Sequence, residues 1–174
     1  KMDYRSLGLV MGIVVGIILC VVLFKFSNRD NKIKTKYDEM QELQRGRAYM
    51  YSFWTLAGLE TVMCLLQLAE VRFFSDPFTA NVTCIIIAAL VHASYSIEHD
   101  AYIGLNTNSK RFTIVCIVIG IFNALIGILQ IARGTLVHDG VLQAPFTNIL
   151  VAIVFLIIGV QMYIKSKTEK TEED

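Results

Sequence analysis

The chain has 174 residues, of which 55% are hydrophobic and only 18% are charged, and its mean hydropathy is +0.55. An ordinary soluble domain carries roughly a quarter charged residues. This composition therefore excludes a water-soluble single domain of this size and indicates an integral membrane protein.

The apolar residues gather in five blocks, each long enough to cross a bilayer. A helix rises 1.5 Å per residue, so about 20 apolar residues cover the ~30 Å hydrocarbon layer. Each crossing must satisfy its own backbone, and the blocks lack the alternating ten-residue pattern of barrel strands. We therefore predict an all-α polytopic membrane protein, a bundle of five transmembrane helices with spans at about 7–24, 48–69, 78–102, 112–132 and 146–164.

The distribution of Lys and Arg predicts the orientation, because cytoplasmic loops retain basic residues. With five spans, twelve of the 16 basic residues fall on one side, and the other side has Lys1, Arg5, Arg72 and Arg133. We predict that the N-terminus is outside and the C-terminus inside, with residues 165–174 as a polar cytoplasmic tail.

The first apolar block also has features of a secretory signal peptide, since Lys1 and Arg5 precede it. The block is too long for that, and no A-x-A-like site follows it. Cleavage would also place the basic first loop outside, against the charge rule. We therefore expect the first span to be retained.

The first loop, over residues 30–47, is highly charged but also patterned. Four apolar residues recur in it at helical spacing: Ile33, Tyr37, Met40 and Leu43. We predict a cytoplasmic amphipathic helix that lies on the inner membrane surface or projects from the second span and pairs with a partner helix, with Gly46 as the hinge between the two. The alternative is a solvated connector with partial helix.

Two prolines stand just before the third and fifth spans. Asp76-Pro77 combines a favoured N-cap residue with a proline at the first helical position, and Pro145 takes that position at the fifth span. Both starts are expected on the outer side.

The four cysteines lie one per span in four of the spans: Cys20, Cys64, Cys84 and Cys116. They have no metal-ligand spacing, so we interpret them as small apolar side chains. A disulfide between Cys64 and Cys84 stays an open alternative, since it depends on geometry that a sequence does not supply.

Ionisable side chains inside a bilayer cost several kcal/mol, so each is a candidate functional residue. Glu60 lies near the middle of the second span, and the other polar residues at similar depth or toward the cytoplasm are His92, Asn123, Ser96, His99 and Asp100. We predict that these six form one intramembrane polar cluster, which would serve a proton or cation path or a small-ligand pocket. The alternative is a protonated Glu60 that only hydrogen-bonds across helices.

Gly8, Gly12 and Gly16 repeat every four positions on the first helix. Such a small-xxx-small pattern forms a helix-packing groove where another backbone approaches closely. The groove would seat the first helix against its own bundle, join two protomers, or receive a separate membrane protein. Gly120 and Ala124 offer a shorter version in the fourth span.

Two segments, KYDEMQELQRGRAYMYSFW at 36–54 and DAYIGLN at 100–106, carry a resemblance to known proteins. They resemble a group of functionally uncharacterised small multi-span membrane proteins of Gram-positive bacteria, with a YDExQ loop, an RG pair and a DAY element. The resemblance implies a bacterial plasma membrane location and a multi-span fold but no activity.

No enzyme signature is present: there is no H-E-x-x-H, no G-x-S-x-G, no paired-aspartate motif and no phosphate-binding loop. We therefore expect no enzyme, no metal and no cofactor. The expected role is a non-enzymatic accessory or interaction protein of the plasma membrane; the alternative is a small transporter or channel with a polar path at Glu60 and His92. The expected partners are the lipid bilayer and a membrane protein or a second copy of the chain, and not nucleic acid.

Overall fold

Helices account for most of the chain in the computed structural model, which describes residues 4–30 and 34–172. In chain order they are α1 (Tyr4–Ser27), α2 (Glu39–Leu68), α3 (Pro77–Glu98), α4 (Ser109–Ala132) and α5 (Phe146–Glu172). A two-stranded antiparallel hairpin of β1 (Val137–His138) and β2 (Val141–Leu142) joins α4 to α5. The prediction of an all-α bundle is confirmed, and each predicted span overlaps one helix. Lys1, Lys32 and Ile33 lie outside the described residues.

Three helices of the described chain are long and apolar enough to cross a membrane: α3, α4 and the Phe146–Thr168 part of α5. The apolar part of α1 found by the same measure is shorter, at Val14–Ser27. α2 begins with several charged residues and carries Glu60 farther along. By length and composition, the protein is a membrane protein.

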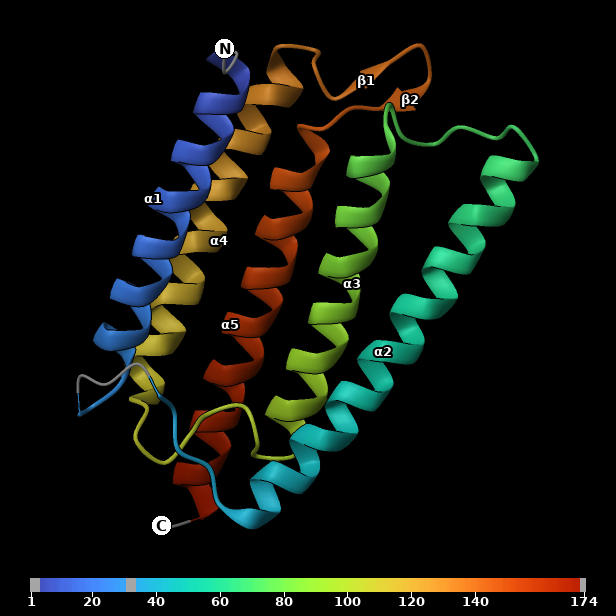
Figure 1. The fold of residues 1–174 in the computed structure, drawn as a ribbon. Helices are drawn as coiled ribbons and strands as arrows, with labels where there is room; N and C mark the ends of the chain where they lie inside the picture. The colour runs from blue at the N-terminus through green and yellow to red at the C-terminus, as the bar shows by residue number, and fades with distance from the viewer. Residues whose placement is uncertain (1–3, 31–33, 173–174) are drawn as a thin grey trace.

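The packing order of the helices is α1, α4, α5, α3, α2 (Figure 1). α5 lies between α4 and α3, and the core at their junction includes Cys116, Val154 and Ile158. α1 packs chiefly on α4, and α2 chiefly on α3. α1 begins and α5 ends at opposite ends of the bundle (Figure 1).

Close packing of α4 on α5 depends on glycines. A Cβ on Gly120 would lie 2.9 Å from the Leu156 side chain and 3.2 Å from the Leu156 backbone nitrogen. Gly127 and Gly159 make similar approaches, to Ile149 and Ile117. Small residues allow helix backbones to approach closely where lipid provides no hydrophobic driving force between helices.

The start of α3 confirms the predicted cap. Asp76 is the N-cap, and its carboxylate accepts hydrogen bonds from the Thr79 backbone nitrogen at 2.8 Å and the Thr79 hydroxyl at 2.7 Å. These bonds, with one from the Ser75 hydroxyl, hold the pKa of the Asp76 carboxyl below its ordinary value. An ionised N-cap also interacts favourably with the helix dipole.

The end of α3 differs from the prediction, which extended the third span to Tyr102. The helix ends at Glu98, because Asp100 adopts a left-handed backbone conformation with φ of 58°. The Ala101 nitrogen then donates back to the Ser96 carbonyl at 2.8 Å, which closes the last turn. Asp tolerates this conformation better than most non-glycine residues.

Of the amphipathic helix predicted over residues 30–47, the described part of the chain forms only the stretch from Glu39 onward, which is continuous with the second span. Residues 34–38 are not helical, and α2 begins at Glu39 and runs through Gly46 without a break. Asp38 and Gln41 form a capping box that fixes this start, with Asp38 Oδ1 accepting from the Gln41 nitrogen at 2.7 Å. The expected stripe is exposed at Met40 and Leu43.

The four cysteines are all free. Cys84 and Cys116 are buried, and Cys20 and Cys64 are exposed on the helix surfaces. The structure therefore places no disulfide between Cys64 and Cys84.

We predict that Gly120→Ala destabilises the protein, whereas Gly12→Ala does not. The added methyl at position 120 would overlap Leu156 and cost about 1–3 kcal/mol as overpacking. At position 12 no atom of the described residues lies within 4 Å of the added methyl. The only expected effect there is a stabilisation of up to about 1 kcal/mol from the higher helix propensity of alanine. Thermal unfolding in detergent, followed by circular dichroism, measures both. Equal stability of the two variants would contradict the close α4–α5 packing.

Candidate functional site

The structure places two central members of the predicted polar cluster at different depths. His92 of α3 packs against Tyr49 of α2, with ring centroids 4.4 Å apart. Glu60 lies eleven residues after Tyr49 on α2, which is about 16 Å farther along the helix axis. Glu60 and His92 therefore do not meet.

Three other predicted members also remain apart. The Asn123 amide donates to the Ile119 carbonyl of its own helix at 2.9 Å. His99 stacks on Tyr95 one turn away, with ring centroids 4.0 Å apart. Ser96 is fully buried, and its hydroxyl has no hydrogen-bond partner within the described structure. The six residues are thus spread along the bundle and do not line one polar path.

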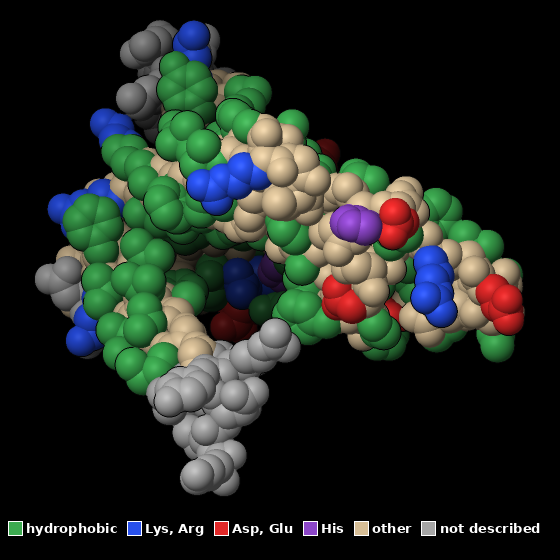
Figure 2. Space-filling view, turned by 90° about the horizontal axis from the view of Figure 1, so that it is seen from above, with side chains coloured by type: hydrophobic (Ala, Val, Ile, Leu, Met, Phe, Trp, Pro, Cys, Tyr) green, Lys and Arg blue, Asp and Glu red, His purple; other side chains and the backbone are tan. Residues whose placement is uncertain are grey.

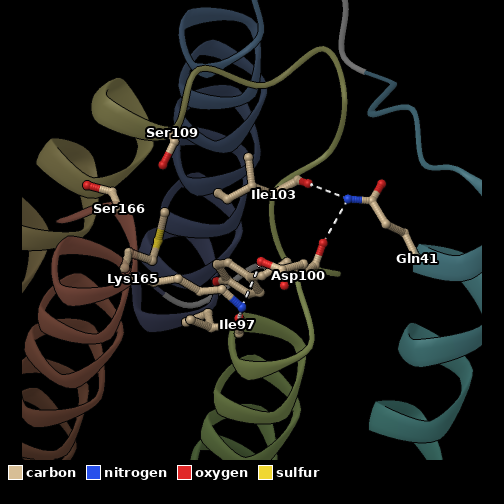
Figure 3. Close-up of a pocket in the computed structure, with 9 residues that line it drawn as sticks. Gln41, Ile97, Asp100, Ile103, Ser109, Lys165 and Ser166 are labelled. Atoms are coloured by element: carbon tan, nitrogen blue, oxygen red, sulfur yellow. Dashed lines mark hydrogen bonds and ion pairs between the residues drawn. The ribbon is translucent and has the colours of Figure 1, made fainter. Parts of the chain in front are cut away.

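Asp100, the last member, belongs to an ion pair at the end of α3. The Lys165 ammonium of α5 lies 2.7 Å from the Asp100 carboxylate (Figure 3). It also donates to the Ile97 and Glu98 carbonyls at 2.6 and 2.8 Å. A cation at a helix C-terminus satisfies carbonyls that lack a helical partner and complements the dipole. Lys165 therefore joins α5 to the end of α3.

The predicted groove on α1 faces nothing else in the described chain. Within 4 Å of a Cβ built on Gly8, Gly12 or Gly16 there is no neighbouring atom. The described structure does not use this face to seat α1 against its own bundle. The two intermolecular alternatives, a second copy or another membrane protein, stay as predictions.

The loops between α1 and α2 and between α3 and α4 pair with each other at one end of the bundle. We call these two loops, residues 28–30 with 34–38 and residues 99–108, the cap. Three backbone hydrogen bonds of 2.7 to 2.8 Å connect these loops or the helix ends beside them. The Arg29 nitrogen donates to the Asn106 carbonyl, the Leu105 nitrogen to the Lys36 carbonyl, and the Asn108 nitrogen to the Ser27 carbonyl. Gly104 allows the close approach, because a Cβ there would lie 2.6 Å from the Lys36 oxygen. The cap thereby links loops about 70 residues apart in sequence.

Asn106 is the main polar side chain of the cap. Its Oδ1 accepts from the Lys36 backbone nitrogen at 2.8 Å. Its amide nitrogen donates to the Lys34 carbonyl at 3.0 Å and to the Asp30 carboxylate at 3.2 Å. One side chain thus satisfies backbone groups of an irregular loop that has no helix or sheet partner.

α2 is attached to the cap by two side chains from its first turns. The Gln41 amide donates to the Asp100 carbonyl at 2.8 Å and to the Ile103 carbonyl at 3.1 Å, as Figure 3 shows. Arg45, one turn later, donates to the Ala101 carbonyl at 3.4 Å. These bonds join the two segments of the resemblance, 36–54 and 100–106, into one unit.

Arg45 lies among aromatic rings and has no acid beside it. Its guanidinium carbon is 4.0 Å from the Tyr37 ring centroid, and one of its nitrogens donates to the Tyr49 hydroxyl at 3.3 Å. Burial raises the pKa of the Tyr37 phenol above its ordinary value, so that ring brings no negative charge at neutral pH. No carboxylate of the described residues lies within ion-pair distance of Arg45.

A cavity of about 760 Å³ lies between α2, α3 and α5, and we call it the recess. Its lining is almost wholly apolar or aromatic: Tyr49, Ser52, Phe53, Leu56, Ile85, Ile86, Ala88, Ala89, His92, Ala93, Tyr102, Val151, Val154, Phe155 and Ile158. Viewed from the hairpin end, the bundle is hollowed, and acidic, basic and histidine side chains lie deep within the hollow (Figure 2). A volume of this size is within the ~300–1,000 Å³ of typical ligand sites.

A second cavity of about 190 Å³ adjoins the recess, and we call it the polar pocket. It is lined by Phe24, Ser27, Asn28, Thr35, Tyr37, Arg45, His92, Tyr102, Ile103, Thr107 and Phe112. His92 and Tyr102 line both cavities. The two cavities together present an apolar space with a cationic side chain at its cap end.

No family model, curated protein or solved structure matches the chain. The site therefore has to be interpreted from its own geometry. Sequence reasoning did not single out Arg45 or Asn106, although both stand inside the segments that carry the resemblance. The available signal was a basic residue and an amide just outside two predicted spans, where side chains reach neighbouring loops.

We predict that Asn106→Ala destabilises the protein by about 1–3 kcal/mol, because it leaves the Lys36 nitrogen and the Lys34 carbonyl without their partner. Asn81→Ala is the matched control, since Asn81 is exposed on α3 and should change stability by less than about 0.5 kcal/mol. Thermal unfolding in detergent compares the two. An Asn106→Ala protein as stable as the control would show that the cap does not hold the bundle together.

Proposed function

We propose that the protein is a multi-pass membrane protein of the bacterial plasma membrane with five spans, its N-terminus outside and its C-terminus inside. The opposite placement of the start of α1 and the end of α5 supports an odd number of crossings (Figure 1). The cap end carries most of the basic residues, which favours a cytoplasmic location for it. The resemblance of segments 36–54 and 100–106 to small membrane proteins of Gram-positive bacteria supports the bacterial location.

Within that membrane, its proposed role is that of a non-enzymatic accessory or interaction protein that binds a membrane component in the recess. The observation that carries this proposal is the apolar recess with Arg45 at its cap end. Such a combination recognises a molecule with an apolar body and a polar or anionic end. The uncovered face of Gly8, Gly12 and Gly16 offers a further surface for a membrane protein or a second copy.

The transport alternative has less support from the geometry. A proton or cation path through Glu60 and His92 needs a continuous series of polar groups between the two side chains. On α3, the residues between these two depths are instead small or apolar, such as Ala88 and Ala89. Asn123 is bonded to its own helix and adds no link.

Single-cysteine labelling tests both the placement and the role. In a variant whose natural cysteines are replaced by alanine, an impermeant maleimide should label His138→Cys in intact cells and Lys34→Cys only after permeabilisation. Glu60→Cys should stay unlabelled from both sides, because in the proposed binding role no water-filled path leads to position 60. Reversed labelling of positions 34 and 138 would contradict the orientation. Labelling of position 60 would favour transport.

A further inference from the structure

The polar pocket places one positive charge at the end of an apolar cavity, and no carboxylate of residues 4–30 or 34–172 forms an ion pair with it. Arg45 contacts a backbone carbonyl, a phenol oxygen and the Tyr37 ring, which are all neutral acceptors. A partly buried cation is costly unless an anion pairs with it. Asp100, a carboxylate of the cap, is paired with Lys165 instead.

A guanidinium is well suited to an anion with several oxygens. Its planar set of N–H donors pairs with phosphate or carboxylate oxygens through two parallel hydrogen bonds. The two bonds that Arg45 makes, at 3.4 and 3.3 Å, are long for charged donors and leave other N–H groups available. His92 Nδ1, at the junction with the recess, is also buried without a hydrogen-bond partner among the described residues.

The depth of these groups matches one leaflet of a bilayer. Arg45 is three residues before the predicted start of the second span, or about 4.5 Å outside the hydrocarbon, at headgroup level. On α2 the recess extends from Tyr49 to Leu56, about 10 Å along the axis and most of the ~15 Å thickness of one leaflet. The apolar lining therefore covers the depth of lipid chains whose headgroup lies beside Arg45.

We propose that the recess binds one anionic phospholipid of the cytoplasmic leaflet, with its phosphate at Arg45 and an acyl chain between α2, α3 and α5. This inference rests on the proposed function, because it requires the cap to face the cytoplasm. A transmembrane helix of a partner would fill the apolar part but would bring no phosphate to Arg45. A second copy of the chain would place a further Arg45, and not an anion, in the assembly.

The single tryptophan of the chain, Trp54, lies beside this site. Trp54 packs against Phe53, a residue that lines the recess, with ring centroids 5.5 Å apart. Bromine atoms on lipid chains quench tryptophan fluorescence at short range. The full-length protein is reconstituted in phosphatidylcholine vesicles, and quenching by brominated phosphatidylglycerol is compared with quenching by brominated phosphatidylcholine at equal mole fractions.

We expect the wild type to prefer phosphatidylglycerol, and Arg45→Gln to lower that preference by about tenfold, the loss expected for one charge-assisted pair. Arg47→Gln removes the same charge two residues away from an exposed position, and should change the preference by less than about twofold. Equal losses in the two variants would mean general attraction to an anionic surface and would overturn the proposal. A preference that survives in Arg45→Gln would also overturn it.

Ala89→Phe provides a second variant that leaves Arg45 in place. Ala89 lines the recess, so the larger ring should occupy the space of the acyl chain and abolish the preference. This variant decides the question if Arg45→Gln does not fold.

Added inorganic phosphate should not displace the lipid; full displacement would mean a site for free phosphate. A cross-linked dimer without lipid preference would assign the recess to a second copy, and either result would overturn the proposal.

The lipid proposal and the proposed function fail in distinguishable ways. If cysteine labelling places the cap inside but phosphatidylglycerol shows no preference, the lipid site is wrong and the membrane placement stands. If the cap is outside, both are wrong.

Discussion

The pairing of two loops at the cap is the constraint on which the rest of the structure depends. α1 packs chiefly on α4 and α2 chiefly on α3, so helix packing connects α1 to α2 only indirectly, through α4, α5 and α3. The Leu105 and Asn108 nitrogens bond across the cap and tie the ends of these two pairs together. Backbone groups of irregular loops at a membrane surface need such partners, because helix and sheet do not supply them.

This constraint explains the recess. The bonds from Gln41 and Arg45 to the loop after α3 hold the start of α2 at the cap. α4 and α5 approach each other closely through Gly120 and Gly159, and that tight contact leaves the larger space between α2, α3 and α5. The position of the apolar cavity, and of Arg45 at its end, therefore depends on the points at which the cap holds the helix ends. The proposed role in binding a membrane component rests on that combination.

Hydropathy predicted the helices well, because bilayer thickness imposes a length on each apolar block. Local signals also succeeded at Asp76, where a short polar side chain precedes a proline and caps the helix. They failed at Asp100, where a single left-handed residue ended α3 four residues before the predicted limit. The hinge predicted at Gly46 is absent, because α2 runs unbroken from Glu39 into the second span. Before Glu39, pairing with the α3–α4 loop overrides the helical spacing at Tyr37.

The predicted polar cluster shows that the depth of a residue along its span does not determine which side chains of a neighbouring helix it meets. Positions counted from span ends placed Glu60 and His92 within reach, but the register between α2 and α3 sets His92 against Tyr49, eleven residues before Glu60 on α2. Register and rotation come from side-chain packing and from loops, which a single sequence does not specify. Arg45 and Asn106 gained their roles in the same way, from bonds to loops 56 and 76 residues distant in the chain.

Hydrogen exchange of the cap amides tests the central claim most directly. In the full-length protein in a bilayer, the Leu105 and Asn108 amides should exchange as slowly as amides near the ends of the helices, because each donates to a carbonyl at 2.8 Å. Exchange of these two amides at the rate of an unstructured peptide, while α4 and α5 stay protected, would contradict the account.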